Sequence, residues 1–175
     1  MQHYAVVFFP KIDLEKLQAF REKYDPKWNV LNPHLTLVFP FVDIPEDGIV
    51  SHLTEVAQQV VSFPITLSGF TKSFDDYLFL LVSNGREHIF NLHDKLYTGI
   101  LSSQLRTDIP FIPHMTLGFF KTNENQFNKD LYKKALSEAE DLMVSIDTEF
   151  NEFSLIQGDG VMPARIIETF KLHSS

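Results

Sequence analysis

The sequence predicts one α+β domain made of two similar lobes that share a single cleft. Segments with the pattern of strands alternate with segments with the pattern of helices along all 175 residues. A short phrase, Pro-His-Leu-Thr-Leu at residues 33–37, returns as Pro-His-Met-Thr-Leu at 113–117, so each half of the chain carries one copy. No linker, low-complexity tract or block of like charges divides the chain, and we place one domain at 1–175.

The first elements follow from apolar runs and helix signals. Residues 4–9 form a short run rich in Val and Phe that stops at Pro10, which is typical of a buried strand. Asp13 is a candidate N-cap for a helix over 14–23, whose apolar residues recur at helical spacing. The first copy of the repeated phrase then continues as a strand at 35–41.

The middle of the chain predicts a helix and a hairpin. A helix is expected at 45–60, because its apolar residues fall on one face. Residues 65–70 and 77–83 read as strands, and Asp75 and Asp76 between them favour a turn.

The second half continues the alternation. The expected elements are a helix at 87–101, a strand at 115–120, a helix at 125–142 and strands at 144–156 and 165–172. The last two strands flank the turn signal Gly158-Asp159-Gly160. This turn lacks the Lys and hydroxyl residue of a complete phosphate loop.

Composition excludes several classes of function. The chain has no cysteine, which excludes disulfides, thiolate metal sites and cysteine nucleophiles. Its net charge of −8 argues against an extended nucleic-acid surface. The apolar run at 5–10 is too short for a membrane span, so we expect a cytoplasmic protein without a membrane partner, and a monomer.

The repeated phrase places its polar residues on one face of a strand. Side chains alternate with period two, so His34 and Thr36 share a face, as do His114 and Thr116. The opposite, core-facing side chains are expected to be Leu35, Leu37, Phe39, Met115, Leu117 and Phe119. Each strand would thus present an imidazole beside a hydroxyl.

Two imidazoles that flank a phosphodiester can divide acid–base work. Imidazole titrates near neutrality, so one ring can take a proton from water while the other gives one to the leaving oxygen. The two Thr hydroxyls, with backbone N–H groups, can hold the phosphate oxygens. This chemistry needs no metal and no cofactor. A duplicated structural hairpin is the alternative interpretation.

These residues resemble the two-histidine (2H) phosphoesterase superfamily, which includes 2′-5′ RNA ligases and cyclic phosphodiesterases. That superfamily is defined by two His-x-Thr/Ser-x motifs. Here they read His-Leu-Thr-Leu at 34–37 and His-Met-Thr-Leu at 114–117. The Val-Phe-Pro-Phe at 38–41 is similar to the family's continuation of the first motif.

The resemblance implies a bilobal fold of two antiparallel-sheet lobes, related by a pseudo-twofold axis, with helices outside. It implies hydrolysis of a 2′,3′-cyclic phosphate or a related 2′-5′ or cyclic phosphodiester, with reversible 2′-5′ RNA ligation as a further activity. His34 and His114 become the acid–base pair, and Thr36 and Thr116 the phosphate ligands. His114 is preferred as base and His34 as acid, although the near-symmetry of the motifs leaves the reverse open.

One departure from the family narrows the substrate. RNA-acting members often carry an Arg shortly after the second motif, where this chain has Lys121 as a point charge. We therefore expect a small nucleotide or an RNA end as the ligand. Phe41, Phe74 and Tyr77 are candidates to stack on a base.

The alternative function is a nucleotide-binding module that keeps the cleft but has little or no catalysis. Both histidines and both threonines are present, which favours an enzyme. We expect structural or solvated roles for the remaining histidines, which are His3, His52, His88, His93 and His173.

Overall fold

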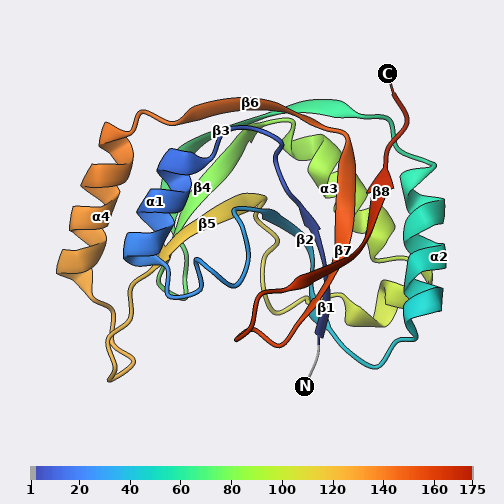
Figure 1. Ribbon diagram of the computed structural model, residues 1–175, viewed down its shortest axis with the longest axis horizontal. Coiled ribbons are helices and arrows are strands. Elements are labelled where there is room, and N and C mark those ends of the chain that lie inside the picture. The colour runs from blue at the N-terminus through green and yellow to red at the C-terminus, as the bar shows by residue number, and fades with distance from the viewer. Residues whose placement is uncertain (1–2, 175) are drawn as a thin grey trace.

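The computed structural model describes residues 3–174 of the predicted domain (Figure 1). The strands are β1 (His3–Phe8), β2 (Leu35–Phe41), β3 (Phe63–Lys72), β4 (Tyr77–Asn84), β5 (His114–Phe119), β6 (Ser145–Phe150), β7 (Glu152–Gly158) and β8 (Arg165–Lys171). The helices are α1 (Glu15–Tyr24), α2 (Glu46–Ala57), α3 (Arg86–Leu96), α4 (Lys129–Asp141) and the short 3₁₀ helix η1 (Gly99–Gln104).

All eight strands form one antiparallel sheet in the order β6-β3-β4-β5-β2-β1-β7-β8. The two strands that carry the repeated phrase, β5 and β2, are neighbours at its centre, and Leu35 pairs with Met115. On either side of this seam lies a half-sheet of four strands. The predicted two-lobed α+β fold is thus confirmed, with the two lobes built on halves of one continuous sheet.

The helices gather at the two ends of the molecule. Figure 1 shows α1 and α4 together at one end and α2 and α3 together at the other. Helix α1 packs against β5 and α4 against β3, whereas α3 packs against β2 and α2 against β8. Helix α1 thus follows β1 in the chain but covers β5 in the other half-sheet. In the same way, α3 follows β4 but covers β2.

The main core lies between the sheet and the helices, and alternation along the strands defines it. Val6 and Phe8 of β1 belong to this core, whereas Ala5 and Val7 form a small second cluster with Ile156 on the other face. The aromatic content is concentrated in the main core, where Phe150 stacks on both Phe8 and Phe63. The other face of the sheet is left open for a cleft.

Three predicted elements differ most from the structure. The segment expected as one strand at 144–156 forms two strands. Strand β6 pairs with β3 in one half-sheet, and β7 pairs with β1 in the other. The helix expected at 87–101 ends at Leu96, and Gly99 adopts a left-handed conformation, with φ of 53°, before η1. The helix expected at 125–142 begins at Lys129, because the Asn128 side chain accepts the Leu131 N–H and caps it.

Within residues 3–174, none of the helices combines the length and the apolar character that a membrane span requires.

The seam between β2 and β5 should be a stability determinant. Leu35 and Met115 are both fully buried, so Leu35→Ala and Met115→Ala should each lower the free energy of unfolding by about 2–5 kcal/mol. Urea denaturation followed by circular dichroism measures this loss. Leu131→Ala is the matched control, because Leu131 is 39% exposed, and should cost less than about 1 kcal/mol. Equal costs at all three positions would contradict the prediction.

Candidate active site

The four motif side chains meet at the seam. Because β2 and β5 are antiparallel and Leu35 lies opposite Met115, the register brings His34 beside Thr116 and Thr36 beside His114. Leu35, Leu37, Met115 and Leu117 are buried in the main core, as predicted, while the four His and Thr residues are half-buried on the other face.

Alternation does not extend through the motif strands as predicted. Phe39 and Phe119 were expected to point into the core, but both are only half-buried. The core positions are taken instead by Val38 and Phe120, each 0% exposed. Register irregularities in the β1–β2 and β4–β5 ladders shift the alternation of both strands, in matching places.

Each histidine ring is fixed by a carbonyl two residues earlier in the chain. His34 Nδ1 donates to the Asn32 carbonyl at 2.7 Å, and His114 Nδ1 donates to the Ile112 carbonyl. A carbonyl oxygen only accepts, so in both rings the Nδ1 carries the proton and the Nε2 keeps its lone pair. The Pro between carbonyl and histidine has a fixed φ, which makes this local geometry rigid.

Burial sets the charge of both imidazoles. Desolvation lowers the pKa of His34 and that of His114 to about 4, against a weaker opposing effect of the carbonyl bonds. The charges of Arg21 and His114 lower the pKa of His34 further, and Asp75 raises that of His114. His114 also lies face to face with Phe79, with ring centroids 3.4 Å apart. Both histidines are therefore neutral at pH 7 when the site is empty of ligand.

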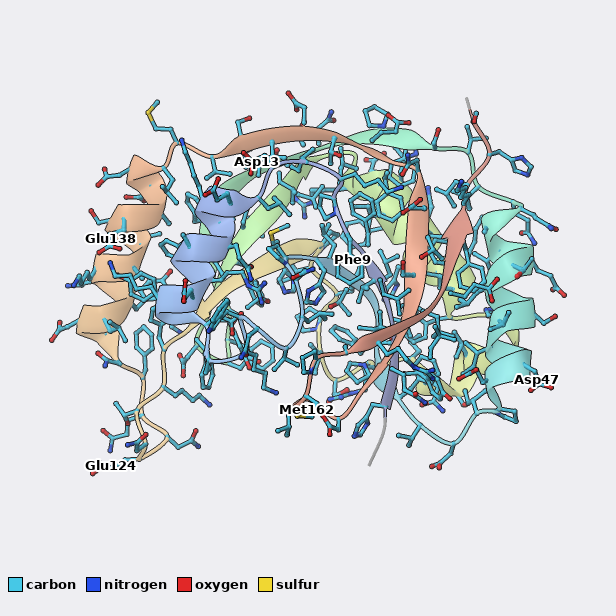
Figure 2. All side chains as sticks on the ribbon, in the orientation of Figure 1. Phe9, Asp13, Asp47, Glu124, Glu138 and Met162 are labelled. Atoms are coloured by element: carbon cyan, nitrogen blue, oxygen red, sulfur yellow. The ribbon has the colours of Figure 1, made fainter. Side chains whose placement is uncertain are left out.

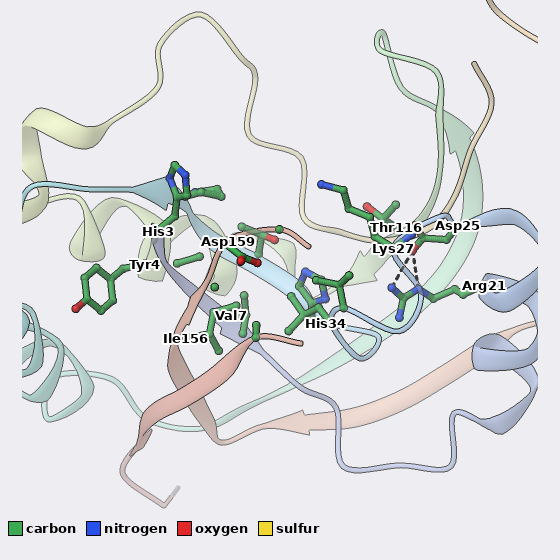
Figure 3. A pocket seen from close by; sticks show the side chains of 18 of the residues that line it. His3, Tyr4, Val7, Arg21, Asp25, Lys27, His34, Thr116, Ile156 and Asp159 are labelled. Carbon is green, nitrogen blue, oxygen red and sulfur yellow. Dashed lines mark hydrogen bonds and ion pairs between the residues drawn. The ribbon is translucent and has the colours of Figure 1, made fainter. Parts of the chain in front are cut away.

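A cavity of about 530 Å³ opens on this face of the sheet (Figure 3). His34, Thr36 and Thr116 line it, as does Tyr77, which the sequence predicted as a base-stacking residue. Its other side is apolar and includes Ala5, Val7, Leu31, Ile156 and Ala164. The cavity thus combines a polar end, formed by His34, Thr36 and Thr116, with an apolar floor on β1 and β7. The fourth motif residue, His114, lies beside Thr36 at the seam but is not among the residues that line the cavity.

The connection between β7 and β8 forms one wall of the cavity. Gly158, Asp159 and Gly160 line it, and the Ala164 N–H donates to the Val30 carbonyl at 2.9 Å, which ties this wall to the segment before the first motif. At its tip, Met162 is 64% exposed and labelled in Figure 2.

Three predicted substrate-binding residues lie elsewhere. The Phe41 ring is 3% exposed within the main core, so it offers no face to a base. Phe74 is 70% exposed in the turn between β3 and β4, outside the cavity lining. Lys121 follows β5 and forms an isolated bridge with Phe127, also outside the lining.

Sequence analysis missed a buried ion pair beside the motifs. Arg21, near the end of α1, and Asp25, directly after it, are 3% and 7% exposed and line the cavity. Their spacing of four residues was a visible signal, but the same spacing is common on solvated helix faces. Among residues 3–174, no three His, Asp or Glu side chains come together as a metal site.

Comparisons with known proteins agree with this fold. A family model described as the 2′-5′ RNA ligase superfamily matches residues 8–161. A Bacillus licheniformis protein that bears the provisional name of a phosphoesterase is 29% identical over 119 residues, covering 65% of this chain and 69% of its own. A similarly named protein of Geobacillus sp. strain WCH70 is 28% identical over 120 residues, with coverage of 66% and 68%.

Solved structures share the whole architecture. Escherichia coli LigT, in a crystal structure with 3′-AMP, matches with a TM-score of 0.63 at 16% identity and covers 98% of both chains. TT0787 of Thermus thermophilus matches with a TM-score of 0.63 at 16% identity and covers 99% of both. At these identities the likeness concerns the fold. Together with the family match over most of its length, it shows that this chain belongs to the 2′-5′ RNA ligase superfamily, the group of two-histidine phosphoesterases that its repeated motif resembles.

Proposed function

We propose that the protein hydrolyses a 2′,3′-cyclic phosphate, or a related cyclic or 2′-5′ phosphodiester, without a metal ion. The observation that carries this proposal is the crossed register at the seam, which sets each motif histidine beside the threonine of the other motif. Two imidazoles and two hydroxyls in this arrangement match a single phosphate group with an oxygen on either side.

The relatives support a phosphoester substrate of nucleotide size. LigT structures contain 3′-AMP, ATP, or phosphate. A cavity of about 530 Å³ is within the range of small-molecule sites, and its apolar floor suits a sugar or base better than a long polyanion. A net charge of −8 also favours a small substrate, because the binding of long RNA requires clustered cationic side chains.

Hydrolysis assigns complementary proton states to the two histidines. One neutral imidazole accepts a proton at Nε2 from the attacking water, while the other, protonated at Nε2, gives its proton to the leaving oxygen. Both Nδ1–H groups stay on their carbonyls throughout, so the rings do not turn. The hydroxyls of Thr36 and Thr116 bind the non-bridging oxygens. The phosphate anion itself raises the pKa of the histidine that serves as acid, because it favours the charged imidazole.

Activity should depend on both motifs and survive a chelator. We expect turnover of nucleoside 2′,3′-cyclic monophosphates in EDTA, with His34→Ala and His114→Ala each lowering kcat about 10²–10⁴-fold. Thr36→Ala and Thr116→Ala should lower kcat/KM by about 10-fold or more, because each removes a hydrogen bond to the phosphate. Chromatographic separation of the 2′- and 3′-monophosphate products measures the rate and shows which oxygen leaves.

The matched control for these variants is His88→Gln, an exposed histidine that stacks on Phe63 outside the cavity lining. It should keep wild-type turnover. Saturable nucleotide binding without turnover would instead favour the binding-module function, and loss of activity in EDTA would refute the metal-independent mechanism.

Stability should fall on acidification in a way that depends on the two histidines. Their pKa is about 4 when folded and near 6.5 when unfolded, so the unfolded chain binds more protons between these values. The free energy of unfolding therefore decreases as pH falls from 6.5 to 4, by roughly 2–3 kcal/mol for each histidine. Urea denaturation at a series of pH values measures this slope. The His34→Gln/His114→Gln double variant should have a flatter profile, and an unchanged slope would contradict the assignment.

A further inference from the structure

The ion pair between Arg21 and Asp25 is a buried pair of charges in the wall of the cavity that the first motif also lines. Arg21 Nε and Nη2 both donate to Asp25 Oδ2, at 3.1 and 2.8 Å, and Nη1 donates to Gln18 Oε1 at 3.2 Å. The second carboxylate oxygen, Oδ1, accepts the Lys27 N–H at 2.9 Å. Figure 3 shows the Arg21 side chain reaching from α1 toward the cavity and His34.

Stability alone is a weak reason for such a pair. Removing two ions from water costs several kcal/mol each, and well-packed apolar residues in their place are often equally stable. Here both residues sit where the chain could instead extend its apolar core, since Leu17, Phe20 and Tyr24 of the same helix are buried in it. The location in the cavity wall, rather than its energetics, distinguishes this pair.

The guanidinium keeps donors for a second acceptor. An arginine has five N–H groups, and within residues 3–174 three of them have protein acceptors. One N–H on each Nη is left, and charged N–H donors of this kind bind phosphate oxygens. Asp25 and Gln18 hold the group in place, so a ligand meets a fixed fork instead of a flexible side chain.

Arg21 and His34 line the same cavity, and the Arg21 side chain points toward His34 (Figure 3). The charge of Arg21 lowers the pKa of His34 more strongly than the opposite charge of Asp25 raises it. In the second lobe, the basic residues in the last turn of α3 are His93 and Lys95, and neither of them lines the cavity. The pair therefore makes the two halves of the cleft electrostatically unequal.

We propose that Arg21 is a phosphate-binding residue of this cleft, held in position by Asp25 and Gln18, and that it takes the place of the cation expected at Lys121. The inference rests on the proposed function, because it places a phosphate between the motifs. The remaining Nη hydrogens donate to the non-bridging oxygens, on the His34 side of the phosphate. The cation then stabilises the additional negative charge that develops when water attacks phosphorus.

Two variants distinguish the effect of the Arg21 charge from that of its guanidinium geometry and from a loss of folding. Arg21→Lys keeps the positive charge but loses the fork, and the double variant Arg21→Met/Asp25→Leu replaces the whole pair with apolar residues. The matched control is Arg106→Lys, since Arg106 forms an exposed pair with Asp108 at 2.6 Å outside the cavity lining. Thermal unfolding first establishes that each variant is folded.

Binding of inorganic phosphate and of adenosine 2′-monophosphate is then measured by isothermal titration calorimetry, with hydrolysis of adenosine 2′,3′-cyclic monophosphate alongside. We expect both folded variants to bind at least about 10-fold more weakly and to lose about 10²–10³-fold in kcat/KM, while Arg106→Lys keeps wild-type values. Wild-type affinity for phosphate in either folded variant would overturn the role of Arg21.

The two proposals fail in different ways. If the wild-type protein hydrolyses the cyclic phosphate and the Arg21 variants do so equally well, only the Arg21 inference is wrong. If the wild-type protein binds phosphate through Arg21 but hydrolyses nothing, the proposed reaction is wrong and the phosphate site stands. If the wild-type protein binds neither ligand, both are overturned.

Discussion

The pairing of Leu35 with Met115 is the constraint on which the site depends. It is the contact at which two half-sheets become one sheet, and its register decides which polar side chains become neighbours. Because side chains alternate along a strand, a slip of either strand by one residue would send that strand's histidine and threonine into the core and its buried apolar residues into the cleft. The apolar side of the motifs, which is fully buried, therefore specifies the geometry of the polar side.

The environment of the histidines follows from the same arrangement. Burial against the strands makes both rings neutral, and a carbonyl two residues upstream fixes each proton on Nδ1. In the proposed mechanism, both neutral imidazoles can accept a proton in the empty site, and one of them becomes the acid when an anion binds. The asymmetry of the cleft then comes from helix α1, because Arg21 and Asp25 line the cavity whereas the basic residues in the last turn of α3 do not.

Sequence patterns predicted much of the fold, because periodicity reports which face of each element is buried. The two motif strands and the helices followed from spacing alone. Tyr77 lines the cavity, and its stacking on a base stays a prediction. Three kinds of information were absent. Strand order and register depend on contacts between residues that are far apart in the chain. The two motif strands are separated by 80 residues, so local patterns could not predict how they pair. Local register shifts moved Phe39 and Phe119 off the predicted core face.

Burial of individual side chains was the third gap. Phe41 had the composition of a stacking residue, yet its ring is enclosed in the core, and nothing in its immediate sequence signalled this. Arg21 and Asp25 had the spacing of an ordinary surface pair, and only the packing of α1 across the seam onto β5 places them in the cavity wall. In both cases the deciding contact is made by an element distant in sequence.

The pairing of β1 with β7 joins residues 3–7 to residues 154–158 and has a consequence for biosynthesis. As the chain leaves the ribosome, the first motif strand and its neighbour β1 emerge early, but the half-sheet to which they belong lacks two strands until the C-terminal segment is made. The apolar floor of the cleft, which needs Ile156, is completed last. Such long-range closure slows folding and leaves strand edges exposed in the meantime. Nascent chains of this protein should therefore gain the capacity to bind ligand only after β7 and β8 have been made and can complete the sheet.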